Sequence, residues 1–235
     1  MDIRLINISK KYKTSEGKYI DALKGINIDI NYQNFISFVG PSGSGKSTLL
    51  NIIIGLIQSS VGNVFWGKDC LSKSPDNLIA YLRRTKFGIV FQDTRFVPEL
   101  TVEENILLPL VINSTSLPEK KEYYNTLLKK LNITDLRKRM PDQLSGGEKK
   151  KASIVRALIN NPEILVADEP TANLDEQTVR EVFNIFYNLN KLGLTVVVAT
   201  HDERFAKFAR ETYFLKDGIV DGFSSREDDK PPKKS

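Results

Sequence analysis

A glycine-rich segment, Gly40 to Thr48, carries residue types at a spacing that can bind phosphate. Its sequence is Gly-Pro-Ser-Gly-Ser-Gly-Lys-Ser-Thr, with Gly40, Gly45, Lys46 and Ser47 at the four fixed positions of the phosphate-loop pattern. Glycines let backbone N–H groups turn toward phosphate oxygens, where a Cβ would hold the ligand away. The lysine adds a positive charge and the serine a hydroxyl for Mg²⁺. The segment therefore predicts a bound nucleoside triphosphate.

Two acidic residues end an apolar run, Ile164-Leu-Val-Ala-Asp-Glu169. Asp168 is placed to hold Mg²⁺ through its water shell, and Glu169 to orient and polarise an attacking water. A strand that ends in Asp-Glu-Pro is by itself a common turn. Beside a phosphate loop, hydrolysis of the triphosphate is the favoured interpretation.

Gln92 and the only histidine, His201, each follow directly after an apolar strand-like run. Lys46, Gln92, Glu169 and His201 therefore all lie just beyond the carboxyl end of a predicted parallel strand. In open α/β sheets ligands bind at that edge. The four residues are the predicted catalytic group.

The segment Leu144-Ser-Gly-Gly-Glu148 allows two interpretations. Ser145 and Glu148 have the spacing of a helix capping box. The two glycines between them lower helix propensity but leave the backbone at the helix start bare, as a phosphate site requires. Both interpretations stay open on these residues alone.

These groups must be positioned by a largely parallel, doubly wound α/β sheet. Buried strands alternate with helices at Phe35–Val39, Phe87–Phe91, Ile164–Asp168 and Thr195–Thr200. Near the start, Ile3–Ile8 and Ile26–Ile30 alternate apolar and polar residues, which predicts an antiparallel edge sheet. Residues of about 93–145 show helical periodicity and are interpreted as an inserted helical subdomain. We expect one domain over residues 1–223 and a disordered, charged tail over 224–235.

Composition and charge narrow the class of protein. Of 235 residues 40% are hydrophobic, enough for a sizeable core, and no apolar run approaches the ~18 residues of a membrane helix. The start of the chain lacks the pattern of a secretion signal. The single cysteine, Cys70, excludes an internal disulfide and suits a reducing compartment. The net charge of +5 supports nucleic-acid binding only weakly, because the tightest basic cluster, Lys149–Lys151, has no interleaved aromatics and is interpreted as solvated surface.

Taken together and in this order, the motifs resemble the nucleotide-binding subunits of ATP-binding cassette (ABC) transporters over residues 3–222. The resemblance implies a P-loop NTPase cassette with a mostly parallel core, an antiparallel edge sheet and a helical subdomain. It implies that Tyr12 stacks on adenine, that Gln92 links Mg²⁺ to a membrane partner and that His201 contacts the γ-phosphate. By this resemblance, residues 144–148 correspond to the family's signature segment, and Asn173-Leu-Asp175 corresponds to its D-loop.

The resemblance also implies a head-to-tail pair of identical chains. ATP would lie on the phosphate loop of one copy and under Ser145, Gly146 and Gly147 of the other. The predicted catalytic residues are Lys46, Gln92, Glu169 and His201, and the predicted Mg²⁺ residues are Ser47, Gln92 and Asp168. The predicted nucleotide-binding residues are Tyr12, Gly40, Pro41, Ser42, Gly43, Ser44, Gly45, Lys46, Ser47, Thr48, Ser145, Gly146, Gly147, Glu148 and Asp175.

Within the family, four features are similar to the ATPases of lipoprotein release, macrolide export and cell division. They are Ala22–Ile26, Leu100–Asn105 with Leu108–Leu110, Ala167–Asp175, and Glu148 in place of the commoner glutamine. Gln33-Asn34 and Lys149–Lys151 depart from the usual Gly-Glu and Gln/Arg-rich runs.

The expected function is that of a Mg²⁺-dependent ATPase at the cytoplasmic face of the cell membrane, which drives separate integral permease subunits. One alternative keeps the membrane partner but makes the dimer a signalling clamp that activates cell-wall enzymes. A nucleic-acid-associated ABC ATPase is disfavoured, because no sustained heptad run for coiled-coil arms is present and the chain holds one cassette, not two.

Overall fold

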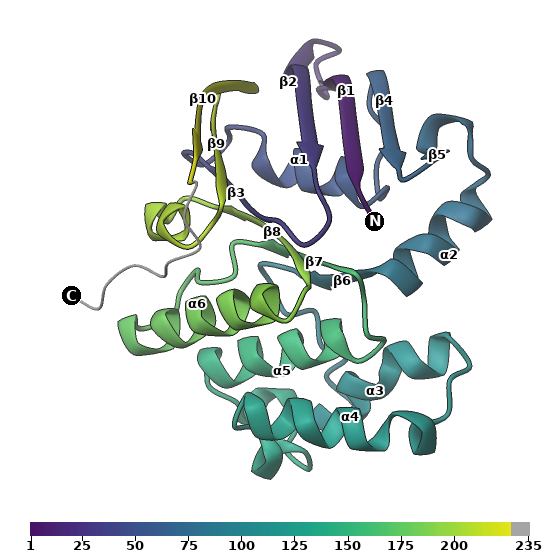
Figure 1. Cartoon of the computed structure of the whole chain (residues 1–235), viewed down its shortest axis with the longest axis vertical. Helices are drawn as coiled ribbons and strands as arrows, with labels where there is room; N and C mark the ends of the chain where they lie inside the picture. Colours follow the sequence, from purple (N-terminus) through teal and green to yellow (C-terminus); the bar gives the residue numbers. More distant parts are fainter. Residues whose placement is uncertain (227–235) are drawn as a thin grey trace.

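A six-stranded sheet joins the segments that carry the predicted catalytic group. In this computed structural model, which describes residues 1–226, the strand order is β10-β9-β3-β8-β7-β6 (Figure 1). The parallel strands are β3 (Phe35–Val39), β6 (Phe87–Val90), β7 (Ile164–Asp168), β8 (Thr195–Thr200) and β9 (Glu211–Lys216), and β10 (Ile219–Ser225) is antiparallel to β9. The predicted parallel α/β core is confirmed.

The register of the central strands brings their carboxyl ends to one edge. Val39 of β3 lies opposite Thr200 of β8, and Ala199 of β8 lies opposite Asp168 of β7. β3 and β8 are buried at every position, and β7 at all but the last, because helices or a second sheet cover both faces. β6 ends at Val90, one residue before the predicted end, and the carbonyl of Phe91 accepts a hydrogen bond from Lys150 instead.

The predicted antiparallel strands are present but belong to a separate sheet of order β2-β1-β4-β5. Its strands are β1 (Ile3–Lys13), β2 (Tyr19–Ile30), β4 (Val61–Trp66) and β5 (Asp69–Cys70). Helix α1 (Lys46–Ile53) crosses behind β2 and β1 in Figure 1 and contributes Leu49, Leu50, Ile52 and Ile53 to a core shared by both sheets. This packing fixes the helix that follows the phosphate loop.

The opposite face of the six-stranded sheet is covered by α5 (Gly146–Leu158) and α6 (Glu176–Lys191). Below them lie α3 (Val102–Ile112) and α4 (Leu117–Lys130) (Figure 1). Together with the 3₁₀ turns Thr134–Leu136 and Pro141–Gln143, these two helices are the regular elements of residues 93–145, a fully described stretch without strands. The remaining elements are α2 (Asp76–Lys86) and the 3₁₀ turns Leu71–Lys73 and Glu203–Lys207.

The last strand extends into the segment that the sequence assigns to a tail. Ser224 and Ser225 pair with Thr212 and Glu211 of β9, so 224–225 are part of the sheet. Residues 227–235 of the predicted tail lie outside the described residues. Among residues 1–226, no helix has the length and apolar character needed to cross a bilayer.

Candidate active site

The phosphate loop takes its shape from contacts with both sheets. Gly45 starts α1 with a φ of 100°, and a Cβ there would lie 2.5 Å from the carbonyl oxygen of Ala22 in β2. A Cβ on Gly40 would lie 2.1 Å from the carbonyl oxygen of Leu215 in β9. Any larger residue at either position would push the loop away from the strands. Because Gly40 and Gly45 lack a Cβ, the loop can lie close to both strands. The free N–H groups at the start of α1 then point into an open cleft.

A cleft of about 550 Å³ lies over this loop. The four residues predicted to be catalytic all line it, although they come from four different segments of the chain. Its lining residues are Ala22, Ser42, Gly43, Gly45, Lys46, Ser47, Thr48, Gln92, Glu169 and His201. Ala22 was not among the predicted site residues, since a small apolar residue in a distant strand carries no chemical signal.

Lys46 is buried inside the loop, with only 5% of its surface exposed. Its ammonium donates hydrogen bonds of 2.8 and 2.9 Å to the carbonyls of Gly40 and Pro41 and lies 3.7 Å from Glu169 Oε1. Nearby, the hydroxyl of Ser44 is buried without a hydrogen-bond partner among the described residues. A buried donor without a partner and a buried cation both fit an anionic ligand that brings oxygen acceptors.

A hydroxyl and a carboxylate meet at Ser47, which lines the cleft, and Asp168, which is not among the lining residues. Ser47 Oγ donates a hydrogen bond of 3.0 Å to Asp168 Oδ1. Burial raises the pKa of Asp168, and the hydrogen bond from Ser47 opposes that shift. Residues 1–226 contain no cluster of three or more His, Cys, Asp or Glu side chains able to hold a metal. The pair fits Mg²⁺, which takes one or two protein oxygens and completes its shell with water and phosphate.

Glu169 is held in a strained position by the end of β8. Its φ is +44°, in the left-handed region that non-glycine residues rarely adopt. Oε2 accepts hydrogen bonds from Thr200 Oγ1 at 3.1 Å and from the His201 backbone N–H at 3.2 Å, and His201 Nδ1 lies 2.9 Å away. Oε1 faces Lys46. The carboxylate is thus fixed at the mouth of the loop, where it can orient a water.

The other predicted nucleotide residues lie outside this cleft. Tyr12 of β1 is 42% exposed, and the ammonium of Lys10 lies 5.3 Å from the centre of its ring. Asp175 caps α6 by accepting a hydrogen bond of 2.9 Å from the backbone N–H of Thr178. Neither residue is among those lining the cleft, so their roles toward a nucleotide stay predictions.

Ser145 and Glu148 form the capping box that their spacing predicts. Ser145 Oγ accepts from the Glu148 N–H at 3.2 Å, and Glu148 Oε2 accepts from the Ser145 N–H at 2.8 Å. Ser145 and Gly146 are exposed at the start of α5 and, like their two neighbours, are not among the residues lining the cleft. The cap therefore does not exclude a second role toward a ligand from outside the chain.

The interpretation of Lys149–Lys151 as solvated surface is wrong for Lys150. This side chain is 3% exposed, and burial lowers its pKa while the carboxylates of Asp93 and Asp168 oppose the shift. Its ammonium donates hydrogen bonds to the carbonyls of Phe91 and Gln92. The ammonium of Lys151 pairs with Glu181 of α6. The sequence did contain a pattern that indicates burial of Lys150. In a helix, Lys150 lies on the same face as Ile154, Ala157 and Leu158, which follow it by four, seven and eight residues.

Comparison with known proteins now identifies the family. The family model described as ABC transporter matches residues 23–172, which are 150 of the 235 residues. The chain belongs to the ABC transporter family. It is an ATP-binding, ATP-hydrolysing subunit of that family, as its motifs predict.

Three relatives define its place among ABC proteins. The uncharacterized ABC transporter ATP-binding protein MJ0796 of Methanocaldococcus jannaschii is 41% identical over 224 residues, 93% of this chain and 95% of that protein. The lipoprotein-releasing system ATP-binding protein LolD of Blochmanniella floridana is 38% identical over 215 residues, 91% of either chain. The macrolide export ATP-binding/permease protein MacB of Syntrophobacter fumaroxidans is 36% identical over 97% of this chain but only 32% of that protein. The similarity to the lipoprotein-release and macrolide-export group is confirmed.

Solved structures show the same fold. A dimeric structure of MJ0796, described as a bacterial ABC transporter cassette, superposes with a TM-score of 0.88 at 39% identity and covers 95% of this chain and 98% of that one. A second structure of the same protein is a dimer in a post-hydrolysis state bound to ADP and Pi, again with a TM-score of 0.88. The ABC cassette fold is therefore shown for this chain.

Proposed function

We propose that two copies of this chain close head to tail over two molecules of ATP with Mg²⁺, and that closure and hydrolysis drive a separate integral membrane partner. The observation that carries the proposal is the division of the site within one chain. The phosphate loop, Gln92, Glu169 and His201 share one cleft, whereas Ser145 to Gly147 are absent from the residues lining it. A second copy would supply the missing half.

Packing around the signature glycines supports this division. A Cβ on Gly146 would lie 3.6 Å from Leu174 and would meet nothing closer, so the chain's own packing does not require glycine there. Ser145 and Gly146 are exposed. Bare backbone at a helix start binds phosphate oxygens, and a ligand held by a facing copy would explain why position 146 lacks a side chain. The dimeric MJ0796 cassettes are consistent with this arrangement.

Within the cleft, the chain's own residues divide the work of hydrolysis. Lys46 and the loop N–H groups bind the β- and γ-phosphates. Ser47, Asp168 and Gln92 would hold Mg²⁺, which supplies charge neutralisation on the phosphate oxygens when bound. Glu169 holds a water and accepts its proton as the water oxygen attacks the γ-phosphorus and the bond to ADP breaks. His201 and Thr200 keep the carboxylate oriented through their contacts with Oε2.

The proposed partner is a permease, and the proposed location is the cytoplasmic face of the membrane. Support comes from the names of the relatives, a lipoprotein-releasing system protein and a macrolide export ATP-binding/permease protein. In MacB one polypeptide carries both functions and this chain spans 32% of it. We propose a permease of the lipoprotein-release or macrolide/peptide-export type as the membrane partner, on the names of these two relatives.

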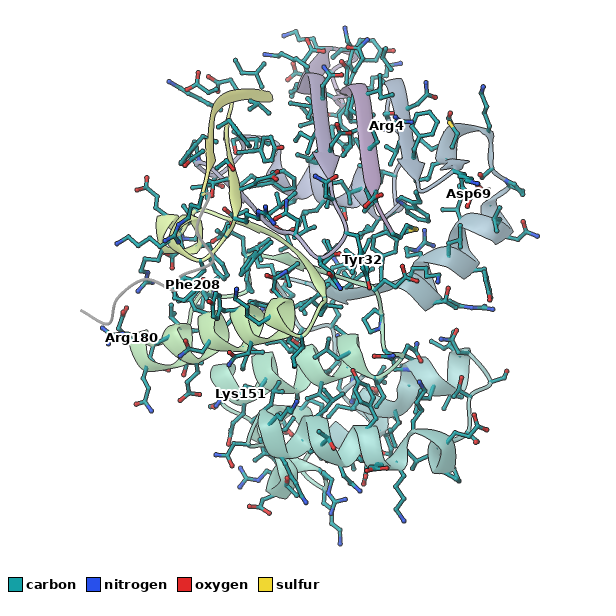
Figure 2. The ribbon with its side chains drawn as sticks, in the orientation of Figure 1. Arg4, Tyr32, Asp69, Lys151, Arg180 and Phe208 are labelled. Atoms are coloured by element: carbon teal, nitrogen blue, oxygen red, sulfur yellow. The ribbon has the colours of Figure 1, made fainter. Side chains whose placement is uncertain are left out.

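The decisive experiment replaces Glu169 by glutamine. Glu169→Gln removes the proton acceptor but keeps the loop, so it should bind ATP, form dimers in sedimentation and hydrolyse roughly 10²–10⁴-fold more slowly. Lys46→Ala should instead weaken ATP binding and leave the chain monomeric. Asp69→Asn, an acid-to-amide change in β5 at the far side of the antiparallel sheet (Figure 2), is the control. A Glu169→Gln chain that stays monomeric with saturating MgATP, or that turns over normally, contradicts the proposal.

The membrane partner requires a second experiment. The protein is purified from host membranes in mild detergent, and the integral subunit that accompanies it is identified. A permease with a periplasmic or extracellular export domain supports transport, whereas a partner that binds cell-wall hydrolases supports the signalling alternative. Recovery without any integral subunit contradicts both.

A further inference from the structure

Helix α5 holds the loop that carries Gln92 through a buried ammonium group. Lys150 Nζ donates hydrogen bonds of 3.1 Å to the carbonyl of Phe91 and 3.0 Å to the carbonyl of Gln92. Burying an ammonium is costly unless its protons are bonded, so these two contacts hold the loop and the lysine together. The departure of residues 149–151 from the usual Gln/Arg-rich run thus lies at a contact with the active site.

The same helix holds the rest of that loop as well. Arg156, six residues further along α5, donates a hydrogen bond of 3.0 Å to the carbonyl of Arg95 and a second one to the carbonyl of Thr94. Its guanidinium lies 4.7 Å from the centre of the Phe96 ring. Four of the five carbonyls from Phe91 to Arg95 are therefore bonded to side chains of one helix. The segment lies outside any helix or strand, so these bonds decide its position.

The start of α5 and the Gln92 loop belong to two different nucleotide sites. Ser145 to Gly147, at the helix start, are the residues proposed above to contact the nucleotide of the second copy. Lys150 lies about one turn further on. Gln92 lines the chain's own cleft beside Lys46 and Glu169. A displacement of α5 would move the backbone of Gln92 with it.

We propose that Lys150 is a positioning residue that fixes the backbone of Gln92 to α5. When Ser145–Gly147 at the start of α5 contact the second copy's nucleotide, this link sets the position of Gln92 in the chain's own cleft. The proposal rests on the proposed function for its second half. Its first half concerns one chain alone. The two halves are therefore tested by different measurements.

Three variants separate hydrogen bonding from other effects. Lys150→Met keeps a long apolar stem but removes the donors. Lys150→Gln keeps two N–H donors on a neutral, slightly shorter side chain. Lys149→Met removes the same charge from the neighbouring, partly exposed residue of the same helix and is the matched control.

Hydrogen exchange on the nucleotide-free chain tests the link between helix and loop. Lys150→Met should raise the exchange rate of amides 92–96 about tenfold, because the loop loses two of its bonds to α5. Lys150→Gln should stay within about threefold of the wild-type rate, and Lys149→Met should match it. Unchanged exchange in Lys150→Met overturns the proposal. If that variant does not fold, tenfold faster exchange in Lys150→Gln overturns it.

Kinetics test the consequence for catalysis. Lys150→Met should lower kcat about tenfold, leave KM for ATP within about twofold and reduce the Hill coefficient for ATP toward one, because Gln92 no longer follows the closing helix. Lys150→Gln should recover most of kcat. The double variant Lys150→Met/Glu169→Gln should still form dimers with MgATP in sedimentation. A raised KM with normal kcat in Lys150→Met overturns the positioning role. If the single variant Glu169→Gln stays monomeric with MgATP, the proposed function is contradicted, but the hydrogen-exchange result still holds.

Discussion

At the scale of residues, two neighbouring carboxylates differ because their surroundings differ. Glu169 has one oxygen bonded by donors from the end of β8 and the other facing Lys46. Asp168 has one hydroxyl donor and is buried, which raises its pKa. The first environment stabilises a fixed carboxylate that can act on a water. The second leaves a carboxylate that is costly to ionise until a cation compensates it.

The raised pKa of Asp168 predicts how Asp168→Asn changes stability. Folding favours the protonated form, so at neutral pH the ionised group costs the folded state stability, and below the pKa of an unfolded-chain aspartate that cost is absent. Asparagine removes the cost at every pH and can still accept a hydrogen bond from Ser47. Asp168→Asn should therefore raise the thermal midpoint of the nucleotide-free, metal-free chain at pH 7.

The pH series provides the control for this prediction. The gain should shrink as the pH falls through the pKa of folded Asp168, because the wild-type side chain also becomes neutral there. Thermal unfolding followed by circular dichroism at several pH values measures it. If the gain in thermal midpoint stays constant with pH, or if the midpoint at pH 7 is lower, burial does not control the pKa of Asp168.

At the scale of elements, the capping box at the start of α5 leaves room for the proposed nucleotide contact. The Ser145–Glu148 box uses two N–H groups of the first turn, and the exposed glycine between the two residues leaves other backbone open. The two glycines themselves differ. A Cβ on Gly147 would lie 2.8 Å from Thr178 Cγ2, whereas a Cβ on Gly146 would meet nothing closer than Leu174 at 3.6 Å. Gly147 serves packing between α5 and α6, and Gly146 stays available for the proposed nucleotide contact.

Alanine at each glycine tests this division. Gly147→Ala should destabilise the chain by about 1–3 kcal/mol, because Thr178 is held by a 2.6 Å hydrogen bond to Asp175 and cannot turn away freely. Gly146→Ala should change stability by less than about 0.5 kcal/mol. In a Glu169→Gln background it should nevertheless weaken ATP-driven dimerisation. Denaturant unfolding and sedimentation measure the two effects, and equal destabilisation by both substitutions would contradict the assignment.

At the scale of the whole molecule, the densest basic cluster of the sequence does not form one solvated patch in residues 1–226. The densest cluster is divided, since Lys150 is buried and Lys151 is paired with Glu181. Other cations pair with acids on several elements, as Lys11 does with Asp21 and Arg139 with Glu148. In residues 1–226, acids on several elements therefore offset these cations.

We therefore expect double-stranded DNA and RNA to leave the ATPase rate within about twofold of its basal value at physiological salt. Reconstitution with the co-purified integral subunit should change that rate, since Gln92 would lie between the nucleotide and the partner. Phosphate release in the presence of each addition measures both effects. Strong, salt-resistant stimulation by nucleic acid would favour the nucleic-acid alternative.

The sequence by itself determined which segments meet at the cleft. Lys46, Gln92, Glu169 and His201 could be placed together because each follows an apolar strand, and parallel strands end at the same edge of a sheet. That inference needs only local patterns and one rule of topology. The same local patterns gave the central strands, the antiparallel pair and the capping box of Ser145.

Only the tertiary structure decided how those groups are held. Ala22 reaches the loop from β2, Lys150 is buried against the carbonyls of Phe91 and Gln92, and Ser224–Ser225 pair with β9. Each contact joins segments far apart in the chain, and its strength depends on burial and distance, which residue order does not contain. Local chemistry therefore fixed what the site can do, and long-range packing fixed which residues position it.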